Sequence, residues 1–170
     1  MRVLHPVFPG DWRSAIVIAA AAIAPAAVHA QGLPGGIVLG MTLAELQQVQ
    51  PGLKPIPHPA RLAGGLVGSW SGDAIEVAGV PLTPTFFFAG GQLRRVEYLA
   101  REGGSAAFGA LLVWERAIAG KELLSSGQEG QYASWANEQM DVYLQLTSTP
   151  RVEQVRLVAR QRVLKEAGEL

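Results

Sequence analysis

The sequence contains no cysteine among its 170 residues. This absence excludes disulfide bonds, thiolate nucleophiles, thiolate metal ligands and a lipid anchor on a cysteine. Stability must therefore come from packing alone, which a chain of this length and 49% apolar composition permits.

Histidine is scarce as well, and beyond residue 30 the sequence has only His58. A single histidine excludes a two-histidine metal site, and a serine-hydrolase triad would have to use this residue. His58 stands between two prolines, so we interpret it as a solvated loop residue and keep a hydrolase as the least favoured hypothesis. Phosphate-binding glycine motifs are also absent, and we expect no cofactor.

The chain lacks an excess of charge of either sign, with 14 basic and 14 acidic residues. Nucleic-acid binding, which requires a strongly basic surface, is therefore not expected. Two carboxylate pairs, Glu97 with Glu102 and Asp73 with Glu76, have no reason in the sequence to be buried together. We interpret both pairs as solvent-facing charges.

Long apolar runs are missing after residue 30, whereas the first 30 residues look like a signal peptide. Arg2 and Arg13 flank the amino-terminal part, Ala15–Ala24 is apolar, and Val28 and Ala30 stand at the −3 and −1 positions. We expect cleavage after Ala30. Residues 31–170 then form a single periplasmic domain of net charge −1, without a transmembrane segment.

The stretch Thr85–Leu99 predicts a central β-hairpin. Three phenylalanines lead into Gly90-Gly91, a pair that suits a tight type I′ turn, and a second strand follows. Strict alternation cannot place both Leu93 and Val96 in the core. We therefore predict a β-bulge near Arg94–Arg95.

Two helices are predicted, one before the hairpin and one after it. The first spans Met41–Val49, where Thr42 and Glu45 have the spacing of a capping box. The second spans Ala106–Ala119, with Ser105 as its N-cap and an apolar stripe at helical spacing.

The remaining segments alternate between strand and loop patterns. The proline-rich stretch Pro51–Pro59 is interpreted as an extended connector, and Ser125–Gly130 as a polar loop. Further strands are predicted at Leu66–Trp70, Ala74–Val80, Gln131–Ala136, Met140–Thr147 and Val152–Val163. The sequence thus predicts an α+β fold, an antiparallel sheet with two helices packed on one face and a possible tandem of α-β-β-β units.

The run Gly40–Leu46 (GMTLAEL) resembles the GMT-x-x-E/Q-V/L start of SmpA/OmlA-type outer-membrane assembly proteins, whose fold is similar to that of the β-lactamase inhibitor protein. The resemblance implies short helices paired with an antiparallel sheet, and action by protein contact without catalysis. This chain departs from the pattern in having no lipidated cysteine and in ending the helix with Val49–Gly52 (VQPG) where the family has LG-x-P.

Arginines and aromatic residues on predicted strands define a possible interaction surface. The arginines form a basic stripe in one interpretation, or an ordinary solvated face together with Glu97 and Glu153 in another. The aromatic residues line a groove in one interpretation, while core packing explains the tryptophans equally well. The predicted surface consists of Trp70, Arg95, Tyr132, Trp135, Tyr143, Arg156 and Arg160.

The favoured hypothesis is a non-enzymatic protein that binds another cell-envelope protein through an open sheet face or a sheet edge. The alternative is a carrier of a small apolar ligand or lipid in a groove between helix and sheet. That groove would use Phe86, Phe88, Trp114 and Trp135.

Overall fold

A computed structural model describes residues 33–127, 130–150 and 153–162 of the chain. The predicted signal peptide, residues 1–30, lies outside the described residues. No helix within the described ranges is long and apolar enough to cross a membrane.

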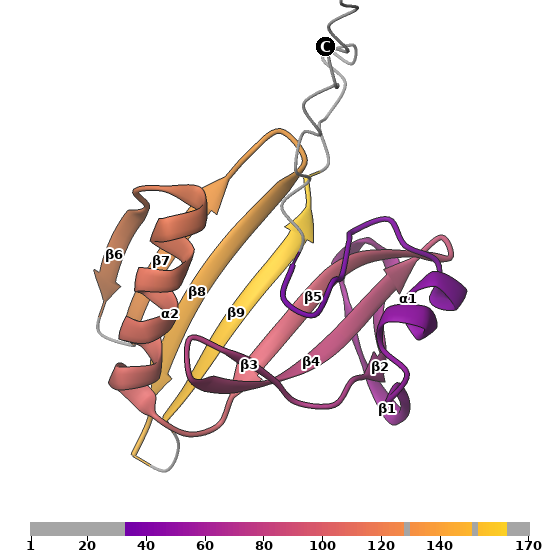
Figure 1. Ribbon diagram of the computed structural model, residues 1–170, viewed down its shortest axis with the longest axis horizontal. Coiled ribbons are helices and arrows are strands. Elements are labelled where there is room, and N and C mark those ends of the chain that lie inside the picture. Colours follow the sequence, from indigo (N-terminus) through magenta and orange to yellow (C-terminus); the bar gives the residue numbers. More distant parts are fainter. Residues whose placement is uncertain (1–32, 128–129, 151–152, 163–170) are drawn as a thin grey trace, which may run out of the picture.

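The elements follow one another in chain order as labelled in Figure 1. They are α1 (Leu43–Val49), β1 (Lys54–Leu62), a short 3₁₀ turn (Ala63–Gly65), β2 (Leu66–Ser71), β3 (Ile75–Val77), β4 (Val80–Ala89), β5 (Gln92–Ala100), α2 (Gly104–Ala119), β6 (Leu123–Gly127), β7 (Gly130–Ala136), β8 (Met140–Ser148) and β9 (Glu153–Gln161).

The strands form one antiparallel sheet in the order β1-β2-β4-β5-β9-β8-β7-β6, and β3 pairs with the start of β4 outside this row. The row divides into two units, α1-β1-β2-β4-β5 and α2-β6-β7-β8-β9. The last strands of the two units, β5 and β9, pair with each other at the centre. The α+β prediction is confirmed. Each unit contributes four strands to the row, one more than the predicted repeat of one helix and three strands, and the first unit also contains β3.

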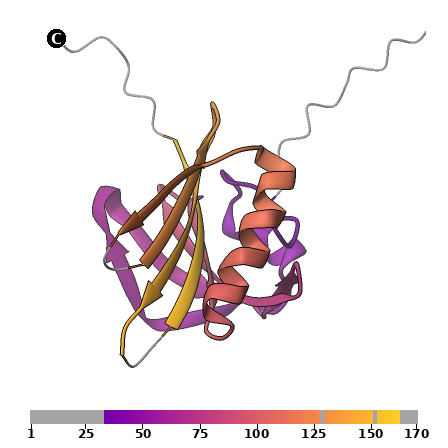
Figure 2. The same cartoon turned by 90° about the vertical axis from the view of Figure 1, so that its left-hand side faces the viewer.

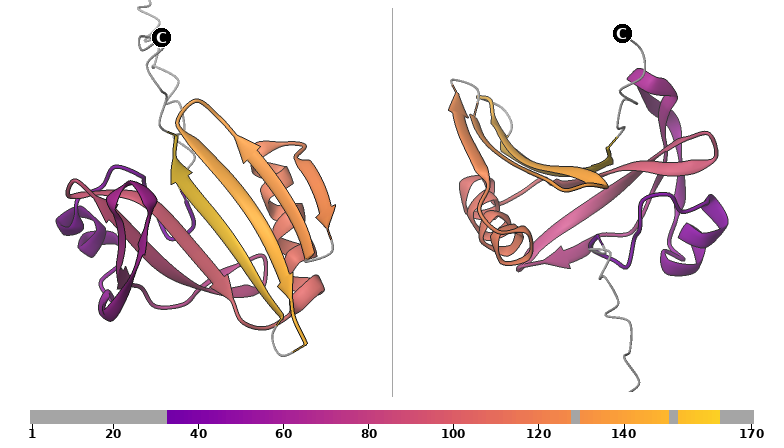
Figure 3. Two further views of the ribbon diagram at one scale, coloured as in Figure 1. Left: turned by 180° about the vertical axis from the view of Figure 1, so that it is seen from behind. Right: turned by 90° about the horizontal axis from the view of Figure 1, so that it is seen from above.

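Both helices lie on the same side of the sheet, as predicted. Seen from above, the sheet curves, with α1 and α2 on its convex side (Figure 3, right). The side view shows α2 standing against one side of strands β7 to β9 (Figure 2). The concave side carries no helix among the described residues, and we call it the open face.

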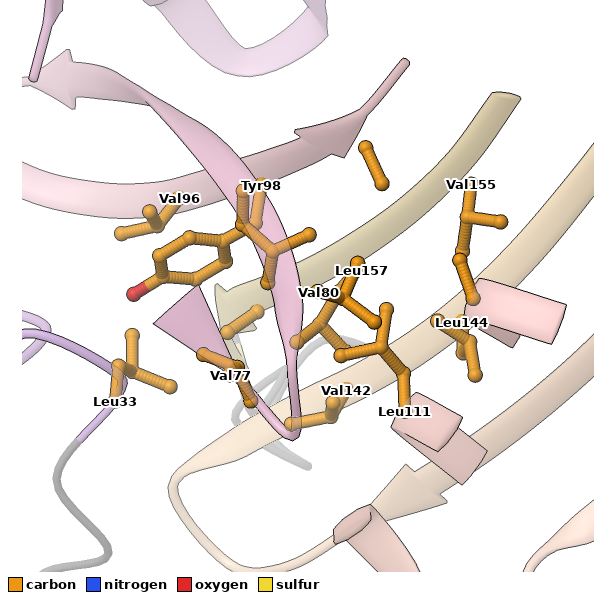
Figure 4. Close-up of a cluster of buried hydrophobic side chains, with 14 of the residues drawn as sticks. Leu33, Val77, Val80, Val96, Tyr98, Leu111, Val142, Leu144, Val155 and Leu157 are labelled. Carbon is orange, nitrogen blue, oxygen red and sulfur yellow. The ribbon is translucent and has the colours of Figure 1, made fainter. Parts of the chain in front are cut away.

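The hydrophobic core fills the space between the helices and the convex face of the sheet. Figure 4 shows Tyr98 and Leu157 from the central strands together with Leu111 from α2. The Tyr98 hydroxyl is buried and donates to the backbone oxygen of Pro34 at 3.0 Å, which fixes the segment before α1 to the core. Burial raises the pKa of this hydroxyl.

The hairpin of β4 and β5 contains the predicted bulge. Phe87 pairs with Arg95, whereas Phe88 pairs with Leu93, so Arg94 is the extra residue in β5. Leu93 and Val96 are consequently both fully buried, which simple alternation would forbid.

Two segments interpreted as loops are strands instead. The proline-rich segment forms β1 at one end of the described sheet, where an outer strand tolerates residues that lack an N–H group. The predicted polar loop overlaps β6, because Leu123–Gly127 pairs with β7. Because β6 is rich in serine and glycine, its sequence lacks the apolar alternation that predicts a strand.

The helix starts show one confirmed and one wrong prediction. The capping box of α1 is present, since Thr42 N–H donates to the Glu45 carboxylate at 2.7 Å and Glu45 N–H donates back to the Thr42 hydroxyl. Helix α2 begins two residues earlier than predicted, at Gly104. Its N-cap is Gly103 rather than Ser105, because the chain enters the helix through a left-handed conformation (φ 91°) that favours glycine.

We expect Thr42→Ala to lower the free energy of unfolding by about 1 kcal/mol, since it leaves a backbone N–H of α1 without its acceptor. Urea unfolding followed by circular dichroism measures the change. Gln48→Ala is the control, because Gln48 is exposed in the same helix. Equal stability of the two variants would mean that the capping box contributes nothing.

Candidate interaction surface and cavity

The open face gathers five of the seven residues predicted to form an interaction surface. The strand registers align Arg95 of β5 with Arg160 of β9 and Asp141 of β8, and the next row aligns Glu97 with Val158 and Tyr143. The five residues are Arg95, Tyr132, Tyr143, Arg156 and Arg160.

Trp70 and Trp135 do not belong to this surface. Trp70 pairs with Phe86 and packs partly buried against the core on the convex side. Trp135 is buried there too, and its indole N–H donates to the backbone oxygen of Gly120 at 3.0 Å. The core interpretation of both tryptophans is therefore correct.

Four arginines on or beside the open face share two carboxylates. Glu97 pairs with Arg95 at 2.6 Å and with Arg156 at 3.8 Å. Asp141 pairs with Arg160 at 3.1 Å and with Arg162 at 3.6 Å. The cluster keeps a positive excess after this pairing.

The acidic residues of the cluster differ from those expected. The solvated-face interpretation expected Glu153 to pair with the arginines, but Asp141 does so instead. Glu153 accepts a hydrogen bond from the Ser148 hydroxyl. Glu97 was interpreted as solvent-facing, but its side chain is only 16% exposed because arginines flank it on both sides.

Arg95 lies at the centre of the open face between two aromatic rings. Its guanidinium carbon is 5.8 Å from the Phe87 ring centre and 5.6 Å from that of Tyr143, within the range of cation–π attraction. Phe87 itself is buried on this face, against the backbone of Gly68. A Cβ atom at Gly68 would come within 2.7 Å of the Phe87 ring, so glycine makes room for it.

His58 is exposed on β1, and the described residues bring no group of three or more metal-ligating side chains together. The pairs Asp73 with Glu76 and Glu97 with Glu102 do not form a shared carboxylate site either. Asp73 instead forms an exposed ion pair with Lys54 at 2.8 Å.

A cavity of about 750 Å³ opens where the end of α2 faces strands β7, β8 and β9. Strand β6 pairs with β7 only as far as Ser134, so the last residues of β7 pair with β8 on one side and have no described strand on the other. Lining residues come from α2 and the three strands and include Glu115, Ile118, Trp135, Met140, Tyr143 and Arg160.

Glu115 is the feature of this cavity that the sequence did not indicate. It continues the core-facing stripe of α2 after Leu111, and only 6% of it is exposed. The described residues give its carboxylate no hydrogen bond and no ion pair, and burial raises its pKa to about 7. Glu122 shows the opposite case, because hydrogen bonds from Arg116 lower its pKa to about 2.

Comparison of the chain with protein-family models, curated proteins and solved structures finds no match. The open face offers charged and aromatic groups for contact. The cavity is partly open, is lined by polar and apolar side chains, and contains one acid without a partner among the described residues.

We expect Arg95→Met to lower the free energy of unfolding by about 2 kcal/mol, since it leaves the half-buried Glu97 without its closest cation. The matched control is Lys54→Met, whose ion pair with Asp73 is 73% and 65% exposed and should contribute less than about 1 kcal/mol. Urea unfolding of both variants measures the difference. The double variant Arg95→Met/Glu97→Gln should regain part of the lost unfolding free energy. If it does not, Arg95 and Glu97 are not energetically coupled.

We expect Glu115→Gln to stabilise the protein at pH 8 by on the order of 2 kcal/mol and to leave stability unchanged near pH 4. The folded pKa of Glu115 is raised, so the wild type is destabilised as the pH rises from about 4.5 to about 7. Urea unfolding across this range measures the effect, with Glu138→Gln, an exposed position, as control. Parallel pH profiles for wild type and Glu115→Gln would contradict it.

Proposed function

We propose that this protein is a non-enzymatic binding module of the cell envelope that holds another envelope protein on its open face. The observation that carries the proposal is the gathering of arginine and tyrosine side chains on a curved sheet face that no described helix covers. Arginine and tyrosine are enriched in protein interfaces, where they combine apolar contact with hydrogen bonding.

The charge of the open face favours an acidic partner surface. Four arginines share two carboxylates there, so further carboxylates from a partner would complete the pairing. Tyr132, Arg156 and Arg160 remain partly exposed and lie around the more buried Arg95. A central anchor surrounded by accessible polar groups is the usual arrangement of an interface.

The face is a better docking site than the edge at β1. Addition of a strand requires backbone N–H groups along the edge, and Pro55, Pro57 and Pro59 of β1 have none. Prolines in an outer strand are a common protection against such pairing. We therefore assign the partner to the open face rather than to the edge at β1.

The periplasmic location rests on the sequence of residues 1–30 alone. The arginine-flanked apolar run and the small residues before Gln31 support export and cleavage after Ala30. The absence of cysteine suits a periplasmic domain that is stabilised by its core.

A second candidate function, carriage of a small ligand, is favoured by the cavity beside α2. Its volume of about 750 Å³ falls within the range of ligand sites, on the order of 300–1,000 Å³. Of the four aromatic residues predicted for a ligand groove, Trp135 lines this cavity, whereas Phe86 is fully buried in the core. Trp114 lies beside a small neighbouring crevice of about 20 Å³.

The proposed protein contact predicts a face-specific crosslink. A photoreactive amino acid at Tyr132 should capture one envelope protein in living cells, while the same group at Val113, which is exposed on α2, should not. Arg156→Glu should weaken binding of the captured partner at least about tenfold, because it reverses a charge on the binding face. Binding of the purified pair, measured by calorimetry at two salt concentrations, quantifies the effect.

The control for the charge reversal is Arg61→Glu, an exposed position on β1 away from the open face. It should leave the affinity unchanged. Capture from Val113 with equal yield, or equal weakening by both charge reversals, would contradict assignment of the partner to the open face.

A further inference from the structure

We propose that the cavity beside α2 binds a small amphiphile with a primary ammonium group, held by the Glu115 carboxylate while its apolar chain lies along the wall of the cavity. This inference rests on the second candidate function, ligand carriage, and names the class of ligand. Glu115 itself lies on the α2 side of the sheet, although the cavity also reaches Tyr132, Tyr143 and Arg160 of the open face.

Glu115 is the group that selects a cation. It is 94% buried, lines both the large cavity and the adjacent small crevice, and has no described hydrogen bond or ion pair. A buried carboxylate without a counter-ion is costly, and an ammonium placed against it would supply both charge and hydrogen-bond donors.

The other charged groups around the cavity do not compensate Glu115. Asp141 is already engaged by Arg160 and Arg162, at 3.1 and 3.6 Å. Lys121 lines the cavity as well but is exposed to solvent. Glu115 is therefore the acid of this cavity that lacks a cation among the described residues.

The wall beside Glu115 suits an apolar chain. Ile118, Trp135, Met140 and Val142 line the cavity, and the indole N–H of Trp135 is occupied by the backbone oxygen of Gly120. The small exposed part of the Trp135 ring therefore offers apolar surface without an unsatisfied donor. An alkyl chain of moderate length would bury its surface here while its head group meets Glu115.

Ionisation of Glu115 gives the proposal a pH signature. At pH 5.5 the carboxyl group is mainly protonated and attracts an ammonium weakly, whereas at pH 8 it is mainly ionised. Affinity should therefore rise about tenfold between these values, since an alkylammonium stays charged throughout. Lys121, Tyr98, Asp141, Arg160 and Arg162 also face the cavity or its crevice, and the Glu115→Gln variant separates their contribution from that of Glu115.

The test is isothermal titration of the exported protein with decylamine, decanol and decanoate below their micelle concentrations. We expect decylamine to bind at least tenfold more tightly than decanol or decanoate at pH 8. Glu115→Gln should lower the decylamine affinity about tenfold and remove its pH dependence, while Glu138→Gln should change neither. Because Glu115→Gln is expected to be the more stable protein at this pH, its loss of binding would not reflect unfolding.

Three results would overturn the proposal, and each has a different consequence for the ligand-carrier function. Equal binding of all three compounds, unaffected by Glu115→Gln, would leave ligand carriage intact and remove the ammonium site. Tighter binding of decanoate would assign the head group to Arg160, Arg162 or Lys121 instead. If none of the three compounds binds, both the ammonium site and the carrier function are excluded.

Discussion

The extra residue at Arg94 in β5 is the constraint on which the rest of the sheet depends. It allows Leu93 and Val96 to face the core together, although three positions separate them along the chain. Beyond the bulge, the register of β5 with β9 sends Arg95 and Glu97 to the open face. The same register determines which β8 side chains lie on the open face, because β9 pairs with β8 without a shift. One inserted residue thus determines which groups each face presents.

The pairing of β5 with β9 joins two units of similar order, each a helix followed by four strands of the row. Neither unit closes a core by itself, since residues of α1 and α2 belong to the same buried cluster. Two helices cover one face of the large curved sheet, and the described residues place no layer on the opposite face. Charged and aromatic side chains occupy it, and the burial of Phe87 and Val158 there depends on the long side chains beside them.

Much of this arrangement could be predicted from local patterns in the sequence. The hairpin, its bulge, the capping box at Thr42 and the strand β8 could be predicted because each follows from turn chemistry, helix capping or periodicity. The strand β6 and the N-cap at Gly103 could not, because they depend on pairing with distant residues and on backbone conformation. The tryptophans show the same limit, since the side of the sheet that holds Trp70 depends on a register shift in β2.

The burial of Glu115 could not be predicted from the sequence for a different reason. In the sequence, Glu115 looks like an ordinary polar residue at the margin of the apolar stripe of α2. Its side chain is buried only because β8 and β9 pack against the helix. The chain can satisfy an acid nearby, as Arg116 does for Glu122 just beyond the end of α2. A leucine at position 115 would extend the core without a desolvation cost. A carboxylate kept without such a partner in the described structure lowers stability near neutral pH, so its presence is better explained by what it meets in the cavity than by folding.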